Sequence, residues 1–171
     1  PVYRTSTVIF PNLEAFENRD PDDFKSMRYG IHGTPTTFAF EEAVAGMEGG
    51  HQAVAVPSGL AAITAALCAF VKSGDHLLMT DSTYAPTRIF CERQLRRNGV
   101  DVEYYDPLIG AGIAKRIKPN TKAVFCETPG SLTFEMQDIP AIAAVAHSHN
   151  IPVLADTTWG TPYFFRSFER G

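Results

Sequence analysis

Two segment ends in the sequence could together hold a charged heteroaromatic ligand. The apolar run Val153–Asp156 ends in a carboxylate, and an acid at the mouth of a buried strand can bind a cation. Residues 54–60 join a second apolar run to an Ala-rich helix, whose first amide N–H groups lack intrahelical partners and suit a phosphate. A protonatable ring nitrogen and a phosphate occur together in pyridoxal 5′-phosphate (PLP). The two segments therefore predict PLP as the cofactor.

Each half of this prediction has a plainer alternative. Gly59 lacks a Cβ that would keep the backbone away from an anion, but Ser58 could be an ordinary N-cap residue. Asp156 could instead accept hydrogen bonds from Thr157 and Thr158 in a turn. A pyridine nitrogen within about 4 Å of this carboxylate would gain about 4 kcal/mol at an effective dielectric of about 20. That attraction would hold the ring protonated, and a protonated ring is a strong electron sink.

Two more loops follow apolar runs. Tyr84 in the first could stack on a flat ring and bring its hydroxyl to the chemistry, or it could be a surface residue. Glu127 begins the second, Glu-Thr-Pro-Gly-Ser, which could line a substrate or form a simple turn. His147 and His149 do not predict a metal site, because residues two apart on a helix do not share a face. No metal is expected.

The elements that must position these residues alternate regularly once a helix that starts near residue 37 has stopped at Gly49-Gly50. The sequence predicts strands at residues 53–56, 76–80, 100–105, 123–127 and 151–155, with helices at residues 60–72, 85–97, 109–117 and 139–149. This alternation indicates βαβ units, hence an α/β fold with a mostly parallel sheet and helices on both faces.

Before this series lies an irregular arm, residues 1–35, and we expect residues 36–171 to form the α/β domain. Such a segment needs something to pack on, either its own domain or another subunit. Its scattered aromatic residues are Tyr3, Phe10, Phe16, Phe24 and Tyr29.

Composition narrows the classes of function. The net charge of −4, with 20% charged residues, argues against a nucleic-acid partner. The longest apolar stretch, residues 60–71, is shorter than the roughly 20 residues of a membrane span, so no membrane partner is expected. Three widely spaced cysteines in apolar surroundings predict a reducing, cytoplasmic compartment and no disulfide framework; they are Cys68, Cys91 and Cys126. The chain lacks a starting Met and a signal pattern, which suggests an excerpt of a longer protein.

Several short motifs occur in one order along the chain. They are Tyr29-Gly30, Met47-Glu48-Gly49-Gly50, Pro57-Ser58-Gly59-Leu60-Ala61-Ala62, Gly74-Asp75-His76, Thr83-Tyr84, Asp106-Pro107-Leu108-Ile109-Gly110, Glu127-Thr128-Pro129-Gly130-Ser131 and Asp156-Thr157-Thr158-Trp159. In order and spacing this set resembles the Cys/Met-metabolism family of PLP enzymes, most of all its bacterial branch that cleaves cystathionine by β-elimination. The resemblance implies a truncated large domain of the fold-type I, aspartate aminotransferase-like class.

The resemblance also implies roles for residues of the predicted edge. The backbone of Gly59 and Leu60 would hold the phosphate, and Asp156 would pair with the ring nitrogen. Tyr84 would stack on the ring and take part in catalysis, while Thr158 would lie beside it. The cofactor-binding residues implied in this way are Ser58, Gly59, Leu60, Tyr84, Asp156, Thr158 and Tyr29.

Tyr29 would reach the phosphate of a neighbouring subunit, which implies a homo-oligomer, a dimer within a tetramer, with shared active sites. The chain departs from the family pattern at Ile31, where an arginine is common, and His32 follows it. The lysine that binds the aldehyde of PLP in the family lies farther beyond Asp156 than this sequence extends. The lysines of the α/β region match no catalytic position; they are Lys72, Lys115, Lys118 and Lys122.

The activity that the resemblance implies for the intact protein is a PLP-dependent carbon–sulfur lyase that converts cystathionine into homocysteine, pyruvate and ammonia. One alternative is a cystathionine γ-synthase or γ-lyase of the same family. Another is an inactive fragment, because the Schiff-base lysine is missing from this chain. A nicotinamide-dependent oxidoreductase would need a complete glycine fingerprint after the first strand, which the Ser58-Gly59 junction does not supply.

Overall fold

The structure, a computed structural model, describes residues 1–18, 20, 23 and 25–171. Phe24, one of the aromatic residues of the predicted arm, lies outside the described residues. The chain forms two compact units, Pro1–Ala55 and Val56–Gly171, each of which is described by itself. The division of the sequence at residue 35 stays a prediction.

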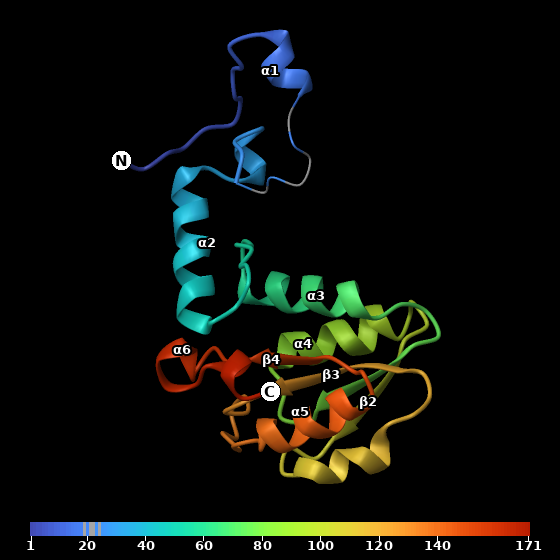
Figure 1. The fold of residues 1–171 in the computed structure, drawn as a ribbon. Coiled ribbons are helices and arrows are strands. Elements are labelled where there is room, and N and C mark those ends of the chain that lie inside the picture. The colour runs from blue at the N-terminus through green and yellow to red at the C-terminus, as the bar shows by residue number, and fades with distance from the viewer. Residues whose placement is uncertain (19, 21–22, 24) are drawn as a thin grey trace. The chain divides into compact units, whose positions relative to one another are not determined.

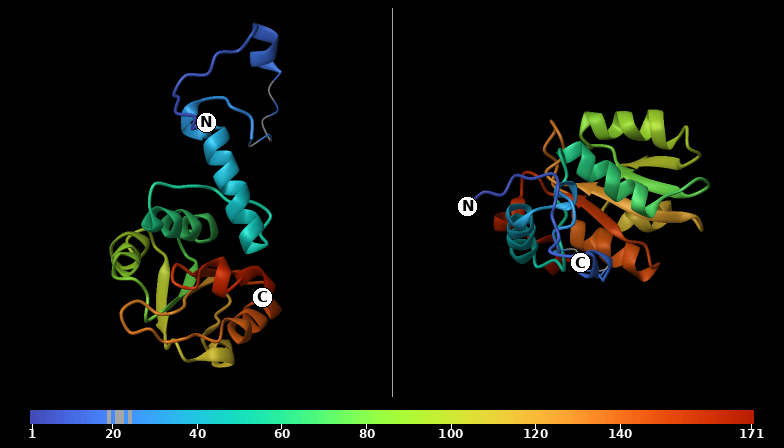
Figure 2. Two further views of the ribbon diagram at one scale, coloured as in Figure 1. Left: turned by 90° about the vertical axis from the view of Figure 1, so that its left-hand side faces the viewer. Right: turned by 90° about the horizontal axis from the view of Figure 1, so that it is seen from above.

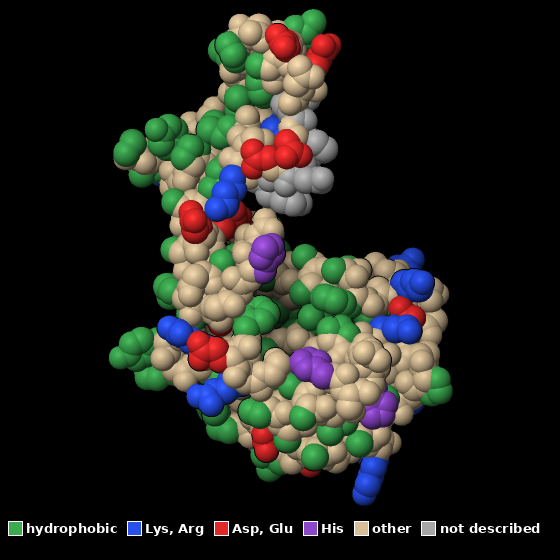
Figure 3. All heavy atoms as spheres, in the orientation of Figure 1, with side chains coloured by type: hydrophobic (Ala, Val, Ile, Leu, Met, Phe, Trp, Pro, Cys, Tyr) green, Lys and Arg blue, Asp and Glu red, His purple; other side chains and the backbone are tan. Residues whose placement is uncertain are grey.

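The unit Pro1–Ala55 contains α1 (Leu13–Glu17), a 3-10 turn η1 (Gly30–His32) and α2 (Pro35–Glu48). Pro35 opens α2, where a missing N–H costs nothing, and Gly49 ends it with φ of 72°. Figure 3 shows hydrophobic side chains on the surface of this unit, and the exposed ones include Val2, Ile9 and Leu13. Whether the arm packs on its own domain or on another subunit stays a prediction.

The unit Val56–Gly171 is built on a four-stranded parallel sheet, as the sequence predicts (Figure 1). Its strands have the order β2-β1-β3-β4. They are β1 (His76–Thr80), β2 (Asp101–Tyr105), β3 (Thr121–Glu127) and β4 (Val153–Asp156). The fold class is therefore confirmed as α/β.

The strand predicted at residues 53–56 is wrong. The segment has no regular secondary structure, and Val54 is 75% exposed. The N–H of Ala55 donates to Glu41 Oε1 at 2.7 Å, so a side chain takes the place of a strand neighbour. An apolar run becomes a strand only where another strand lies beside it, and none of the described strands pairs with this one.

Helices cover both faces of the sheet (Figure 2). On one face lie α3 (Gly59–Phe70), α4 (Ala85–Phe90) and the π-helical turn η2 (Cys91–Leu95); on the other lie η3 (Gly110–Arg116) and α5 (Ile139–Ser148). The chain ends with α6 (Thr161–Phe164) and η4 (Ser167–Glu169). Among the described residues, no helix is both long enough and apolar enough to cross a bilayer.

The two cores follow from the alternation of strand side chains. Leu77 and Met79 of β1 pack with α3 in the first core, and Leu78 packs with α5 in the second. The helix predicted at residues 85–97 is present but changes from α to π after Phe90. The helix predicted at residues 109–117 is instead the 3-10 helix η3 (Gly110–Arg116), because Gly110 and Gly112 weaken a regular α-helix.

The three cysteines are unpaired. Burial raises the pKa of Cys91 to about 12 and that of Cys126 to about 11, so both thiols stay protonated at neutral pH. The apolar surroundings read from the sequence suggest burial, which is wrong for Cys68, since it is exposed on α3. The apolar stretch of α3 has one face that does not meet the sheet, and Cys68 lies on it.

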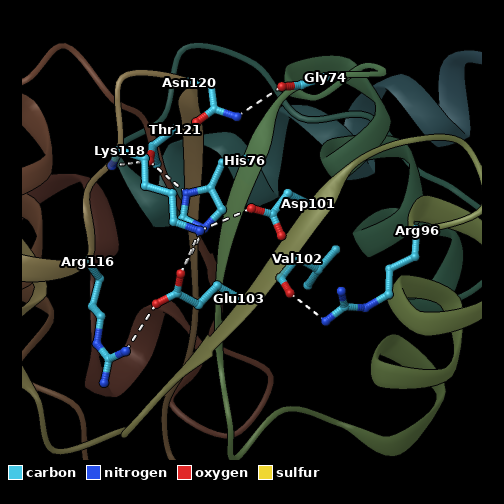
Figure 4. A network of polar contacts seen from close by, with 10 residues as sticks. All are labelled: Gly74, His76, Arg96, Asp101, Val102, Glu103, Arg116, Lys118, Asn120 and Thr121. Atoms are coloured by element: carbon cyan, nitrogen blue, oxygen red, sulfur yellow. Dashed lines mark hydrogen bonds and ion pairs between the residues drawn. The ribbon is translucent and has the colours of Figure 1, made fainter.

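A buried histidine stands at the amino edge of the sheet (Figure 4). His76 begins β1 and is fully buried; its Nδ1 lies 2.8 Å from Thr121 Oγ1 and its Nε2 lies 3.4 Å from Glu103 Oε2. Lys118 Nζ lies 2.8 Å from Glu103 Oε2 and 3.0 Å from Asp101 Oδ2. Burial, and then the charge of Lys118, hold the pKa of His76 below its usual range.

This lowered pKa makes the free energy of unfolding depend on pH. The unfolded chain takes up the imidazole proton at about pH 6.5, whereas the folded protein takes it up only at lower pH. Stability is therefore lost as the pH falls below about 6.5. We expect the Tm of the protein to fall between about pH 7 and pH 5 more steeply than the Tm of His76→Gln. Parallel curves for the two proteins would contradict this account.

Candidate functional site

The strand order creates a topological switch point at the carboxyl edge of the sheet. From β1 the chain moves to β2 on one side and then returns past β1 to β3, so the direction reverses between β1 and β3. Ligands of open α/β sheets bind at such a switch point, outside the carboxyl ends of the strands. Helix α3 also begins on the side where the strands end (Figure 1).

Glu127 connects β3 to the loop that follows β1 at this edge. It ends β3, and its Oε2 accepts hydrogen bonds from Tyr84 N–H at 2.7 Å and Thr83 Oγ1 at 3.2 Å. Its register partner is Asp156, so the two carboxylates lie side by side. Burial raises the pKa of Glu127, and the charge of Asp156 adds to this, while the two hydrogen bonds oppose it.

Asp156 ends β4 and is half-buried. Its Oδ1 accepts from Thr158 N–H at 2.9 Å and from Thr158 Oγ1 at 2.6 Å. The hydrogen bonds to the following turn, which the sequence left open, are thus formed by Thr158. Within the described part of the chain, Oδ2 has no hydrogen-bond partner, so this oxygen is available to a ligand.

The first turn of α3 offers two amide donors. Ser58 is extended, and its side chain accepts from Ala61 N–H at 3.1 Å. The N–H groups of Gly59 and Leu60 have no acceptor among the described residues, as expected at a helix start. A Cβ on Gly59 would meet nothing within 4 Å, so open space lies beside this backbone. Ser58 is therefore an N-cap, and the next two amides stay free for an anion.

Tyr84 stands directly before α4, and its side chain is 45% exposed. Contacts between residues bring Tyr84, Glu127, Asp156 and Thr158 together at one edge, and α3 begins on the same side of the sheet (Figure 1). Tyr29 belongs to the unit Pro1–Ala55. Its ring lies edge-on to that of His32, with the two ring centroids 6.1 Å apart. The role of each predicted residue stays a prediction.

The sequence placed Glu127 at the end of a predicted strand, in a loop that could line a substrate, but did not indicate its contact with Tyr84. The signal that could have marked Glu127 as a site residue is the one that singled out Asp156, an acid at the end of an apolar run. Among the described residues, no three His, Cys, Asp or Glu side chains gather in a way that could hold a metal ion.

The residues at this edge fit PLP. The cofactor needs an acceptor for its ring N–H, donors for its phosphate and a flat surface for its ring. Asp156 Oδ2, the free amides of Gly59 and Leu60, and the exposed ring of Tyr84 supply these three kinds of group.

Comparison with known proteins shows the enzyme family to which the chain belongs. The model of the Cys/Met metabolism PLP-dependent enzyme family matches residues 1–171, and the chain belongs to this family. A solved structure from Campylobacter jejuni that holds N′-pyridoxyl-lysine-5′-monophosphate matches with a TM-score of 0.90 and 27% identity, over 100% of this chain and 42% of that one. PLP is therefore the cofactor of this fold and family.

The sequence relatives carry names of several reactions. A protein of Rhizobium johnstonii is 53% identical over 100% of this chain and 42% of its own length. Cystathionine beta-lyase of Escherichia coli is 38% identical over 99% of this chain and 44% of its own length. An L-alanine/L-glutamate racemase of Wolbachia pipientis is 36% identical over 100% of this chain and 44% of its own length. An L-methionine gamma-lyase of Treponema denticola is 35% identical over 100% of this chain and 43% of its own length. The chain thus spans less than half the length of these relatives.

Proposed function

We propose that this chain is the cofactor-binding part of a PLP-dependent carbon–sulfur lyase that cleaves cystathionine by β-elimination. One observation carries the proposal: two features that suit PLP lie on the same side of the sheet in a chain of this family. They are the carboxylate of Asp156, which has one oxygen free, and the free helix amides of Gly59 and Leu60. The likeness to the Escherichia coli lyase supports cystathionine as the substrate. The products would be homocysteine, pyruvate and ammonia.

Each residue of the edge has a role in this proposal. Asp156 holds a proton on the ring nitrogen, and Thr158 orients the carboxylate through its 2.6 Å hydrogen bond. The amides of Gly59 and Leu60 bind the phosphate, aided by the dipole of α3. Tyr84 would stack on the ring and bring its hydroxyl to the reacting groups. PLP, when bound, supplies the electron sink for the carbanion at the substrate Cα.

The oligomer is also part of the proposal. Tyr29 of one subunit would contact the phosphate in a neighbouring subunit, so that a cytoplasmic homo-oligomer shares its active sites. The 45% exposed ring of Tyr29 and the 79% exposed side chain of Ile31 support an interface at this arm.

Product analysis tests the reaction. We expect the whole protein, loaded with PLP and given cystathionine, to release pyruvate together with homocysteine. Release of 2-oxobutyrate would instead assign γ-elimination and overturn the proposed reaction.

A γ-lyase is the second candidate, and the Treponema denticola relative is the observation that favours it. The same assay, repeated with L-methionine, separates it, because a γ-lyase would release 2-oxobutyrate from this substrate as well. Interconversion of L- and D-alanine without any cleavage of a carbon–sulfur bond would point to a racemase, the activity in the name of the Wolbachia pipientis relative.

A further inference from the structure

Glu127 is a buried carboxylate that has no role in the proposed reaction. It is 6% exposed, and both of its side-chain hydrogen bonds go to Thr83 and Tyr84, in the loop that follows β1. Its backbone carbonyl is held separately, by Gln137 Nε2 at 2.6 Å. The end of β3 is therefore anchored without the carboxylate, and the carboxylate serves the neighbouring loop.

Burying this carboxylate has a cost that strand packing does not explain. A buried charge is stabilised only by good partners, and an apolar side chain of similar size often costs less. Asp156, the register partner, adds repulsion, and the pKa of Glu127 is raised accordingly, by burial first. The only hydrogen-bond donors that meet this carboxylate among the described residues are those of Thr83 and Tyr84.

The shorter of the two bonds, at 2.7 Å, comes from the backbone N–H of Tyr84. The carbonyl of Tyr84 accepts from Arg88 N–H at 3.1 Å in the first turn of α4. Both peptide groups of Tyr84 are thus fixed, while its side chain is 45% exposed. The direction in which the ring leaves the backbone is set by these two bonds.

We propose that Glu127 is a positioning residue that fixes the ring of Tyr84 over the cofactor through the backbone N–H of Tyr84. This inference rests on the proposed function, in which Tyr84 stacks on PLP. Glu127 itself touches neither the ring nor the substrate in this account.

Two variants of the whole protein separate a positioning role from a structural one. Glu127→Gln keeps an oxygen that accepts from Tyr84 N–H, whereas Glu127→Leu keeps the bulk and leaves that N–H without a partner. The first readout is amide hydrogen exchange in the protein free of PLP, in the peptide that contains Tyr84. We expect faster exchange in Glu127→Leu and near wild-type exchange in Glu127→Gln.

The second readout is the Kd of PLP in the wild-type and Tyr84→Ala backgrounds. A hydrogen bond to a charged group is worth enough for Glu127→Leu to raise the Kd by about tenfold in the wild-type background. If Glu127 acts through Tyr84, the same change should have an effect of less than about twofold in Tyr84→Ala, because contacting residues are not additive. Glu127→Gln should restore most of the affinity.

The possible results distinguish a failure of the positioning role of Glu127 from a failure of the proposed function. Unchanged exchange at Tyr84 in Glu127→Leu, or an equal loss of PLP affinity in both backgrounds, would overturn the positioning role and leave the proposed function standing. Wild-type protein that binds no PLP would overturn the proposed function and with it the role of Glu127 toward the cofactor. The exchange of the Tyr84 peptide would then still show whether Glu127 holds the loop.

Discussion

Asp156→Asn is expected to lower kcat/KM for cystathionine cleavage by about a thousandfold. The carboxylate is proposed to stabilise a protonated ring nitrogen by about 4 kcal/mol, and each factor of ten in rate corresponds to about 1.4 kcal/mol. Asn keeps an oxygen that accepts from Thr158, so the turn after β4 stays intact. It replaces the free Oδ2 with an amide donor, which cannot accept a proton from the ring. The loss therefore reports the negative charge together with the acceptor oxygen that faces the ring nitrogen.

The matched control is Asp101→Asn, which makes the same chemical change at the opposite edge of the sheet. Asp101 begins β2 and pairs with Lys118, and this exposed pair contributes little to stability. We expect Asp101→Asn to stay within about twofold of wild-type activity. Asp156→Asn within tenfold of wild type would show that no cation depends on this carboxylate.

Gly59→Ala is expected to move cofactor affinity and stability in opposite directions. The added methyl would stand in the open space beside the two free amides, and we expect the Kd of PLP to rise by about 10- to 100-fold as phosphate contacts are lost. The methyl meets no protein atom within 4 Å, and alanine restricts the unfolded chain more than glycine does. The Tm of the protein without PLP should therefore hold or rise.

Gly46→Ala is the control for this change. Gly46 lies inside α2, and a Cβ there also meets nothing within 4 Å, so this change adds the same methyl to a helix away from the proposed site and favours the helix. We expect this variant to bind PLP as the wild type does. Wild-type affinity in Gly59→Ala would place the phosphate elsewhere.

Much of the sheet could be predicted because the central strands β1 and β3 are largely buried on both faces and read as short apolar runs. The strand at residues 76–80 has the predicted bounds, and both Asp156 and Glu127 end strands as expected. The run at residues 53–56 has the same character but no neighbouring strand, and a local pattern carries no information about neighbours. Periodicity likewise did not reveal that the helix after Tyr84 changes to a π turn at Cys91.

The candidate site was predictable where one residue type carries the chemistry, as at Gly59 and Asp156. The contact between Glu127 and Tyr84 was not, because it joins residues 43 positions apart and depends on the reversal of the chain between β1 and β3. Such a contact is set by topology rather than by local spacing.

A crystal structure of the whole protein with PLP tests the central claim most directly. The account predicts the ring nitrogen within hydrogen-bond distance of Asp156, at about 2.7–3.2 Å, and phosphate oxygens at the same range from the N–H groups of Gly59 and Leu60. A phosphate bound away from the start of α3, or a ring nitrogen facing any other group, would contradict it.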